Sequence, residues 1–173
     1  MTSILRGAAF AAIVFGLQAV SAVAAEKVYE KPSAFLTRHF GKVPQTRVLK
    51  IDGTRQKQLA AILGHRYGQK QVRYWAEGGK SAWILEEIGK TEPITTGFII
   101  RGGKISEVKV LIYRESHGWE VSRPFFTKQF AGATLSGNRL DKNIDGIVGA
   151  TLSVRALTKL GAAALYLSRQ SGE

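Results

Sequence analysis

Thr95 to Tyr113 has the sequence TTGFIIRGGKISEVKVLIY, which is the strongest structural signal in the chain. Two apolar runs flank the pair Gly102-Gly103, and Gly-Gly between such runs is typical of a two-residue hairpin turn. In the second run Val108 and Val110 alternate with charged residues, which is the period of a strand that buries one face. The segment therefore predicts an antiparallel hairpin in a sheet with one solvent-facing side.

The regions on either side of this hairpin predict helices and a second hairpin. Downstream, Leu157, Leu160, Ala164 and Leu167 recur at helical spacing, which predicts a C-terminal helix packed on the sheet. Elsewhere the pattern predicts short helices at 33–40, at about 54–67 and from Pro124 onward, and strands at 71–75 and 82–88. The predicted fold is α+β: a single domain in which an antiparallel sheet is packed by a C-terminal helix and short helices.

The N-terminal residues 1–25 have the pattern of a secretory signal peptide. Arg6 precedes an apolar run at 7–17, and small residues follow at 21–25. The apolar run is shorter than the roughly twenty residues that a membrane-spanning helix needs. We therefore expect an exported, periplasmic protein that is soluble after cleavage, and an uncleaved N-terminal anchor is the alternative.

The composition restricts the chemistry that such a protein can perform. Removal of residues 1–25 leaves 24 basic and 13 acidic residues, a net charge of +11, and the chain has no cysteine. The absence of cysteine excludes disulfides, thiolate metal sites and cysteine nucleophiles. The positive charge favours an acidic redox partner, an anionic membrane surface or an anionic ligand, and after export nucleic acid is not an expected partner.

Few side chains offer conventional catalytic or metal-binding groups. His39, His65 and His117 are isolated in the sequence, so no metal site is predicted. Glu86 and Glu87 would point to opposite faces of a strand and cannot act as a carboxylate pair. We predict no catalytic residue.

The segment that precedes the C-terminal helix carries the most specific pattern. It reads NIDGIVGATLS from Asn143 to Ser153 and places Thr151 at or near the start of the helix. In one interpretation the Thr151 hydroxyl only caps the helix, with Gly149 supplying the turn. In the other, the free N–H groups and the helix dipole make this terminus a phosphate site.

The sequence Asp145-Gly-Ile-Val-Gly-Ala-Thr151 resembles the flavinylation motif of the FMN-binding domain family, which is related to the flavin subunits of sodium-pumping quinone reductase and of the Rnf complex. The segment 97–113 resembles the hairpin of that family, and Glu115-Ser116-His117-Gly118 resembles its Glu-Thr-Pro-Gly loop beside the flavin. The likeness divides the domain into an N-terminal part, 26–93, and an FMN-binding core, 94–169. It differs at Val148, where the family more often has Ser or Thr, and at Ser116-His117.

The resemblance implies a specific set of site residues. FMN would be joined through a phosphoester bond to Thr151 by an FAD:protein FMN transferase, which would recognise Asp145. The other cofactor-binding residues that it implies are Gly149, Ala150, Leu152, Ser153, Glu115, Ser116, His117, Gly118 and Trp119. Trp119, Phe125 and Phe126 are candidates for packing against the flavin ring, and each could equally be a core aromatic.

A second Gly-Ala-Thr-Leu-Ser sequence offers Thr134 as a rival acceptor. Lys128 stands where the motif has its acidic residue, and Gly137-Asn138 follows, which favours a turn over a helix. We therefore predict Thr151 as the acceptor.

The sequence as a whole predicts an exported flavoprotein that transfers electrons between a membrane-associated reductase and another redox protein. One alternative is a basic, non-enzymatic module that binds an anionic surface or polymer. Another is a flavin-dependent reductase of a small substrate.

Overall fold

The computed structural model describes residues 26–173, so the predicted signal peptide lies outside the described residues. The described chain forms one α+β domain around a six-stranded antiparallel sheet with strand order β1-β6-β5-β4-β3-β2. The strands of this sheet are β1 (Lys27–Val28), β2 (Arg47–Lys50), β3 (Gln71–Glu77), β4 (Lys80–Ile88), β5 (Pro93–Arg101) and β6 (Lys104–Tyr113). The predicted fold class is confirmed.

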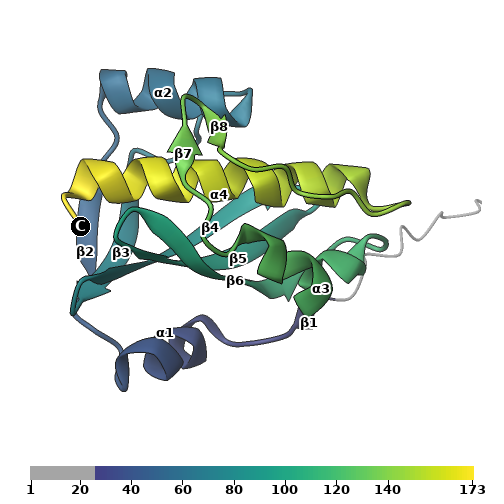
Figure 1. Cartoon of the computed structure of the whole chain (residues 1–173), viewed down its shortest axis with the longest axis horizontal. Helices are drawn as coiled ribbons and strands as arrows, with labels where there is room; N and C mark the ends of the chain where they lie inside the picture. Colours follow the sequence, from purple (N-terminus) through teal and green to yellow (C-terminus); the bar gives the residue numbers. More distant parts are fainter. Residues whose placement is uncertain (1–25) are drawn as a thin grey trace, which may run out of the picture.

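The helices lie on both sides of this sheet (Figure 1). The α-helices are α1 (Pro32–Phe40), α2 (Gly53–Leu63), α3 (Pro124–Thr127) and α4 (Thr151–Ser171), with short 3-10 helices η1 (Trp119–Ser122) and η2 (Lys128–Phe130). A small hairpin of β7 (Leu135–Ser136) and β8 (Arg139–Leu140) precedes α4. Figure 1 shows α4 across one face of the sheet with α2 outside it, and α1 on the opposite face.

The central hairpin forms as the sequence predicts. Ile100 pairs with Ile105 and Arg101 with Lys104, so Gly102-Gly103 is the two-residue turn. Both glycines have positive φ, 55° and 72°, which matches the right-handed twist of the flanking strands and disfavours other residues. The 71–75 and 82–88 strands also pair as predicted, within β3 and β4.

The sheet does not have one solvent-facing side over its whole area, and that prediction is wrong. Phe35 and Leu36 of α1 form a second core cluster with Ala82, Ile99 and Leu111 on the face opposite α4. Gly97 permits this close packing, because a Cβ there would lie 2.8 Å from the Phe35 ring. Alternation within one strand cannot reveal a helix, distant in sequence, that covers the other face.

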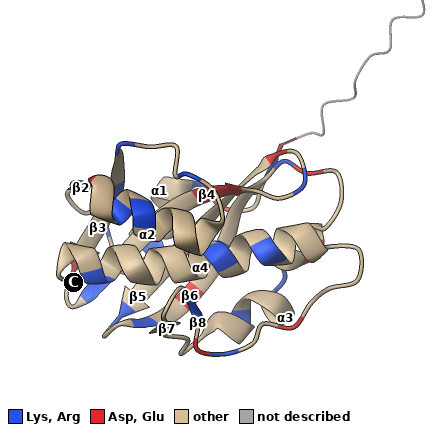
Figure 2. Ribbon diagram, turned by 90° about the horizontal axis from the view of Figure 1, so that it is seen from above, with Lys and Arg blue, Asp and Glu red and all other residues tan. Residues whose placement is uncertain are grey.

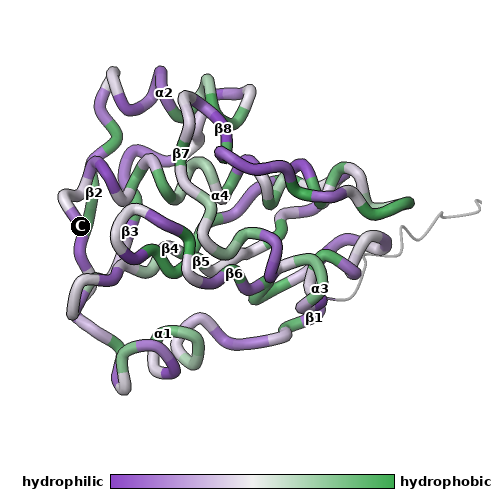
Figure 3. Tube along the Cα trace, in the orientation of Figure 1, coloured by the Kyte–Doolittle hydropathy of each residue, from purple (hydrophilic) through white to green (hydrophobic). Residues whose placement is uncertain are grey.

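The C-terminal helix is confirmed and supplies much of the main core. Leu157, Leu160 and Leu167 are fully or almost fully buried in it. Helix α2 packs on the outside of α4 and is mostly hydrophilic in Figure 3. It ends earlier than predicted, at Leu63, because Gly64 takes the left-handed conformation (φ 81°) and donates its N–H to the Ala60 carbonyl. Among residues 26–173 no helix is both long and apolar enough to cross a membrane.

Candidate functional site

Helix α4 begins without a side-chain cap. The residue before it, Ala150, occupies the cap position with φ −119° and ψ 18°, and no side chain bonds to the first-turn N–H groups. Thr151 is the first helical residue and is exposed. Within the described residues its hydroxyl has no hydrogen-bond partner, so the interpretation of Thr151 as a helix cap is wrong.

This uncapped end of α4 is suited to an anion. The first N–H groups of any α-helix lack an intrahelical acceptor, and here Val154 is the first residue whose N–H reaches back, to the Ala150 carbonyl at 2.9 Å. The 21 residues of α4 align their peptide dipoles with the positive end at Thr151. A phosphate beside the Thr151 hydroxyl would therefore receive N–H donors and a favourable field.

The loop after β6 packs directly against the first turn of α4. The Tyr113 hydroxyl donates to the His117 carbonyl and lies 3.0 Å from the Ser153 hydroxyl. Burial raises the pKa of Tyr113 to about 12, so the phenol stays protonated and keeps this contact at physiological pH. Gly118 has φ +85°, and a Cβ there would lie 2.9 Å from both the Ser153 and the Tyr113 oxygens. These contacts hold the predicted loop beside the predicted acceptor.

The two segments together line a surface pocket of about 390 Å³. Its lining residues are Lys90, Glu115, Ser116, His117, Gly149, Ala150, Thr151, Leu152 and Ser153. Apart from Lys90, all of them were predicted as site residues from the sequence. Lys90 comes from the turn between β4 and β5, and nothing in the sequence distinguishes it from the many other basic residues.

Glu115 organises the backbone behind this pocket. Its carboxylate accepts the N–H groups of Thr91 (2.7 Å), Glu92 (3.0 Å) and Lys90, and also the Thr91 hydroxyl (3.1 Å). Burial opposes ionisation of this carboxyl, but the N–H groups of Glu92, Thr91 and Lys90 outweigh it and hold its pKa below the usual range. Glu115 therefore fixes the turn that carries Lys90.

Replacement of this carboxylate should destabilise the turn. We expect Glu115→Gln to lower the free energy of unfolding by about 2 kcal/mol at neutral pH, because a charged acceptor of several N–H groups is lost. The pKa of Glu115 is lower in the folded protein than in the unfolded chain. The stabilisation that its carboxylate provides is therefore complete above the unfolded-state pKa, and it is lost as the pH falls through the folded-state pKa. Urea unfolding at neutral and acidic pH measures both effects. A destabilisation that persists unchanged at acidic pH would contradict this role.

Three predicted site residues lie outside the pocket. Gly118 packs behind it, and Asp145 is exposed in the loop before α4, where its N–H donates to the Gln129 side chain at 2.7 Å. Trp119 is partly exposed, with Lys27 and Arg123 over its ring at 5.5 and 5.0 Å from the centroid. The tip of the Asp145 loop is hydrophobic in Figure 3, and Val148 there is completely exposed.

The two phenylalanine candidates for ring packing have different environments. Phe126 is fully buried in the main core and stacks edge-on with Phe130, so it cannot contact a flavin, and that interpretation is wrong. Phe125 is 63% exposed. It does not line the pocket at Thr151.

The rival acceptor Thr134 is already engaged. Its hydroxyl donates to one oxygen of Asp141 at 2.7 Å, and its N–H donates to the other at 2.8 Å. A phosphate on this hydroxyl would displace the bond and approach a carboxylate. Thr134 precedes β7 and not a helix, so it also lacks the favourable helix dipole.

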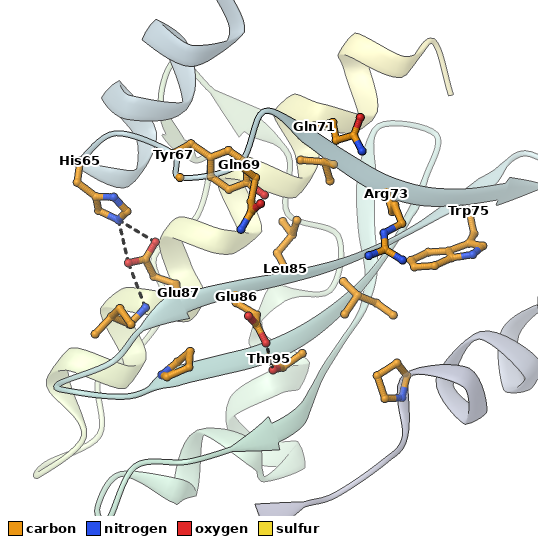
Figure 4. Close-up of a pocket in the computed structure, with 16 residues that line it drawn as sticks. His65, Tyr67, Gln69, Gln71, Arg73, Trp75, Leu85, Glu86, Glu87 and Thr95 are labelled. Carbon is orange, nitrogen blue, oxygen red and sulfur yellow. Dashed lines mark hydrogen bonds and ion pairs between the residues drawn. The ribbon is translucent and has the colours of Figure 1, made fainter. Parts of the chain in front are cut away.

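A separate pocket of about 550 Å³ lies over β3 and β4 and contains no predicted site residue (Figure 4). Both of the neighbouring glutamates, Glu86 and Glu87, line this pocket, and their carboxylates bind different partners. Glu86 accepts the Thr95 hydroxyl at 2.6 Å, whereas Glu87 pairs with His65 at 2.9 Å. The His65 pKa is raised, first by the Arg66 backbone and then by Glu87. Among residues 26–173, no cluster of three His, Cys, Asp or Glu side chains could hold a metal.

The fold and this site define a small α+β domain with an uncapped helix N-terminus beside an exposed threonine. Residues 89–166 match the model of the FMN-binding domain family, so the chain contains a domain of this family. It is therefore a flavoprotein whose cofactor is FMN. The comparison with curated proteins and the comparison with solved structures gave no match.

Proposed function

We propose that this protein is an exported electron carrier with FMN joined covalently to Thr151. The observation that carries the proposal is the exposed Thr151 hydroxyl at the uncapped N-terminus of a 21-residue helix, inside a pocket that also contains Lys90. Reversible uptake of electrons is the chemistry that FMN supplies when bound. The chain contributes the attachment point, the helix dipole and the basic surroundings.

Attachment follows from the chemistry of the hydroxyl. The Thr151 oxygen bonds to the phosphorus of the FMN half of FAD, the pyrophosphate bond breaks, AMP leaves and the hydroxyl proton is released. An FAD:protein FMN transferase would catalyse this step and would use Asp145 for recognition. The exposure of Asp145 and Val148 supports this, because both are accessible to another protein.

The residues around Thr151 are suited to holding the resulting phosphodiester. The first N–H groups of α4 provide donors, and the Lys90 ammonium adds a positive charge on the same pocket. Gly149, with φ 82° and no neighbouring atom within 4 Å of its would-be Cβ, leaves room on the other side. Positive charge near a flavin favours its anionic reduced forms through Coulomb attraction.

Electron transfer is favoured over turnover of a small substrate. The only histidine of the pocket at Thr151, His117, lies 2.9 Å from the adjacent Ser116 hydroxyl, but among residues 26–173 no third side chain bonds to this imidazole or this hydroxyl to orient them as a base and a nucleophile. A membrane-associated reductase or another redox protein would be the partner. A covalent tether suits a protein outside the cytoplasm, where a dissociated cofactor would be lost by dilution.

Intact mass and peptide mapping test the proposal. The full-length chain should be expressed in a host that has the transferase and an export pathway. We expect a mass increase equal to FMN minus one water on the peptide that contains Thr151, with yellow colour that survives denaturation. An unmodified chain from that host, or FMN that is released on denaturation, would contradict covalent attachment.

A further inference from the structure

A second pocket lies along α4 and is separate from the one at Thr151. It has a volume of about 610 Å³ and shares no lining residue with the Thr151 pocket. One wall is the end of α2, the opposite wall is the β7–β8 hairpin with the loop that follows, and α4 contributes the remaining lining residues. The family motif does not account for it.

The walls of this pocket are held in place by hydrogen bonds between the elements that form it. The Gln58 side chain of α2 donates to the Asn138 side chain at the tip of the hairpin. The Lys159 ammonium of α4 donates to the Leu63 carbonyl at the end of α2. The base is apolar, since Ile62, Leu140 and Ala162 are each less than a tenth exposed. The cavity is therefore preformed, with a hydrophobic floor.

The rim of the pocket is strongly basic. Its charged lining residues are Arg139, Lys142, Arg155 and Lys159, and no aspartate or glutamate lines it. Figure 2 shows basic residues on the N-terminal half of α4. None of the four cations forms an ion pair with any residue of 26–173, and the guanidinium groups of Arg139 and Arg155 have no hydrogen-bond partner there.

The nearest acidic residue in the sequence offsets only part of this charge. Asp141 lies between two lining residues, and both of its carboxylate oxygens accept hydrogen bonds from Thr134. Its pKa is lowered, first by the Thr134 backbone and more weakly by the charge of Lys142, so it supplies one negative charge against four positive ones. Four like charges around one cavity repel each other, and a bound anion relieves that repulsion. Guanidinium groups also offer paired N–H donors that match the oxygens of a phosphate.

We propose that this pocket binds an organic phosphate, with the phosphate between Arg139 and Arg155 and an apolar body on the floor of Ile62, Leu140 and Ala162. Four positive charges suit a phosphate, which carries up to two negative charges, better than a carboxylate. The apolar floor favours an ester over inorganic phosphate. A soluble phosphate ester and a lipid phosphate headgroup share this chemistry.

Calorimetric titration of the flavin-loaded protein with naphthyl phosphate tests the proposal. We expect saturable binding that weakens with added salt, and much weaker binding of naphthol and of inorganic phosphate. Arg139→Gln with Arg155→Gln should reduce the affinity for naphthyl phosphate at least about tenfold, because two charged donors are removed. The matched control is Lys57→Gln with Arg101→Gln, which removes the same charge from exposed positions outside the pocket and should leave the affinity unchanged.

The other outcomes assign the source of the phosphate or overturn the site. A lipid headgroup is the source if the protein cosediments with phosphatidylcholine vesicles that contain phosphatidic acid and naphthyl phosphate blocks this binding. A soluble ester is the source if the protein binds naphthyl phosphate but does not cosediment with these vesicles. Equal losses in both double variants, or vesicle binding without naphthyl phosphate binding, would overturn the pocket in favour of diffuse surface charge. Titration of Thr151→Ala protein should give the same affinity, so failure of the flavin proposal leaves this one standing.

Discussion

Thr151→Ala is expected to abolish covalent FMN and to leave the free energy of unfolding within about 0.5 kcal/mol of the parent value. The first effect follows because the acceptor oxygen is removed. The second follows because the Thr151 hydroxyl bonds to no described residue and alanine has the higher helix propensity. A helix-capping threonine would instead cost about 1 kcal/mol on replacement. Intact mass of parent and variant from a host that has the transferase measures FMN attachment. Urea unfolding of both proteins prepared without FMN measures stability independently.

Thr134→Ala is the matched control, since it removes the same hydroxyl from the same Gly-Ala-Thr-Leu-Ser sequence. It should retain FMN fully. It should also be less stable than the parent by about 1 kcal/mol, because the hydrogen bond from the Thr134 hydroxyl to Asp141 is lost. FMN retained on Thr151→Ala, or lost from both variants, would contradict the assignment of Thr151.

The parts of the fold that were predictable from the sequence depend on local chemistry. Gly102-Gly103 specifies its hairpin because only residues that tolerate positive φ fit that turn, and the helical period of α4 persists over many turns. The second core under α1 was not predictable. It requires Phe35 to reach Gly97, a contact between distant segments that neither segment signals alone.

In the candidate site, too, the local motifs were predictable from the sequence, whereas the contacts between distant segments were not. The acceptor and the loop beside it were predicted by family resemblance, whereas their physical connection through Tyr113, Gly118 and Ser153 depends on how β6 and α4 cross. Glu115 was expected beside the flavin, and the structure shows that its carboxylate accepts hydrogen bonds from backbone N–H groups of the β4–β5 turn. Lys90 reaches the pocket only because of that turn.

Gly118→Ala should lower the free energy of unfolding by about 3 kcal/mol, from two independent causes. A non-glycine residue at φ +85° costs on the order of 1 kcal/mol. The added methyl group would also lie 2.9 Å from the Ser153 and Tyr113 oxygens and 3.3 Å from the Ala150 Cβ. All three neighbours are buried, so the first turn of α4 must shift away from the loop at a further cost of about 2 kcal/mol.

Gly132→Ala separates the two causes. Gly132 has a similar φ, +79°, but a Cβ there would have no neighbour within 4 Å. This variant should therefore lose only the conformational part, about 1 kcal/mol, and the difference between the two variants isolates the contact of Gly118 with α4. Urea unfolding of both proteins measures that difference. Equal destabilisation would mean that the loop and the helix terminus are not packed together, and the Thr151 pocket would then lack the rigid wall that Gly118 provides.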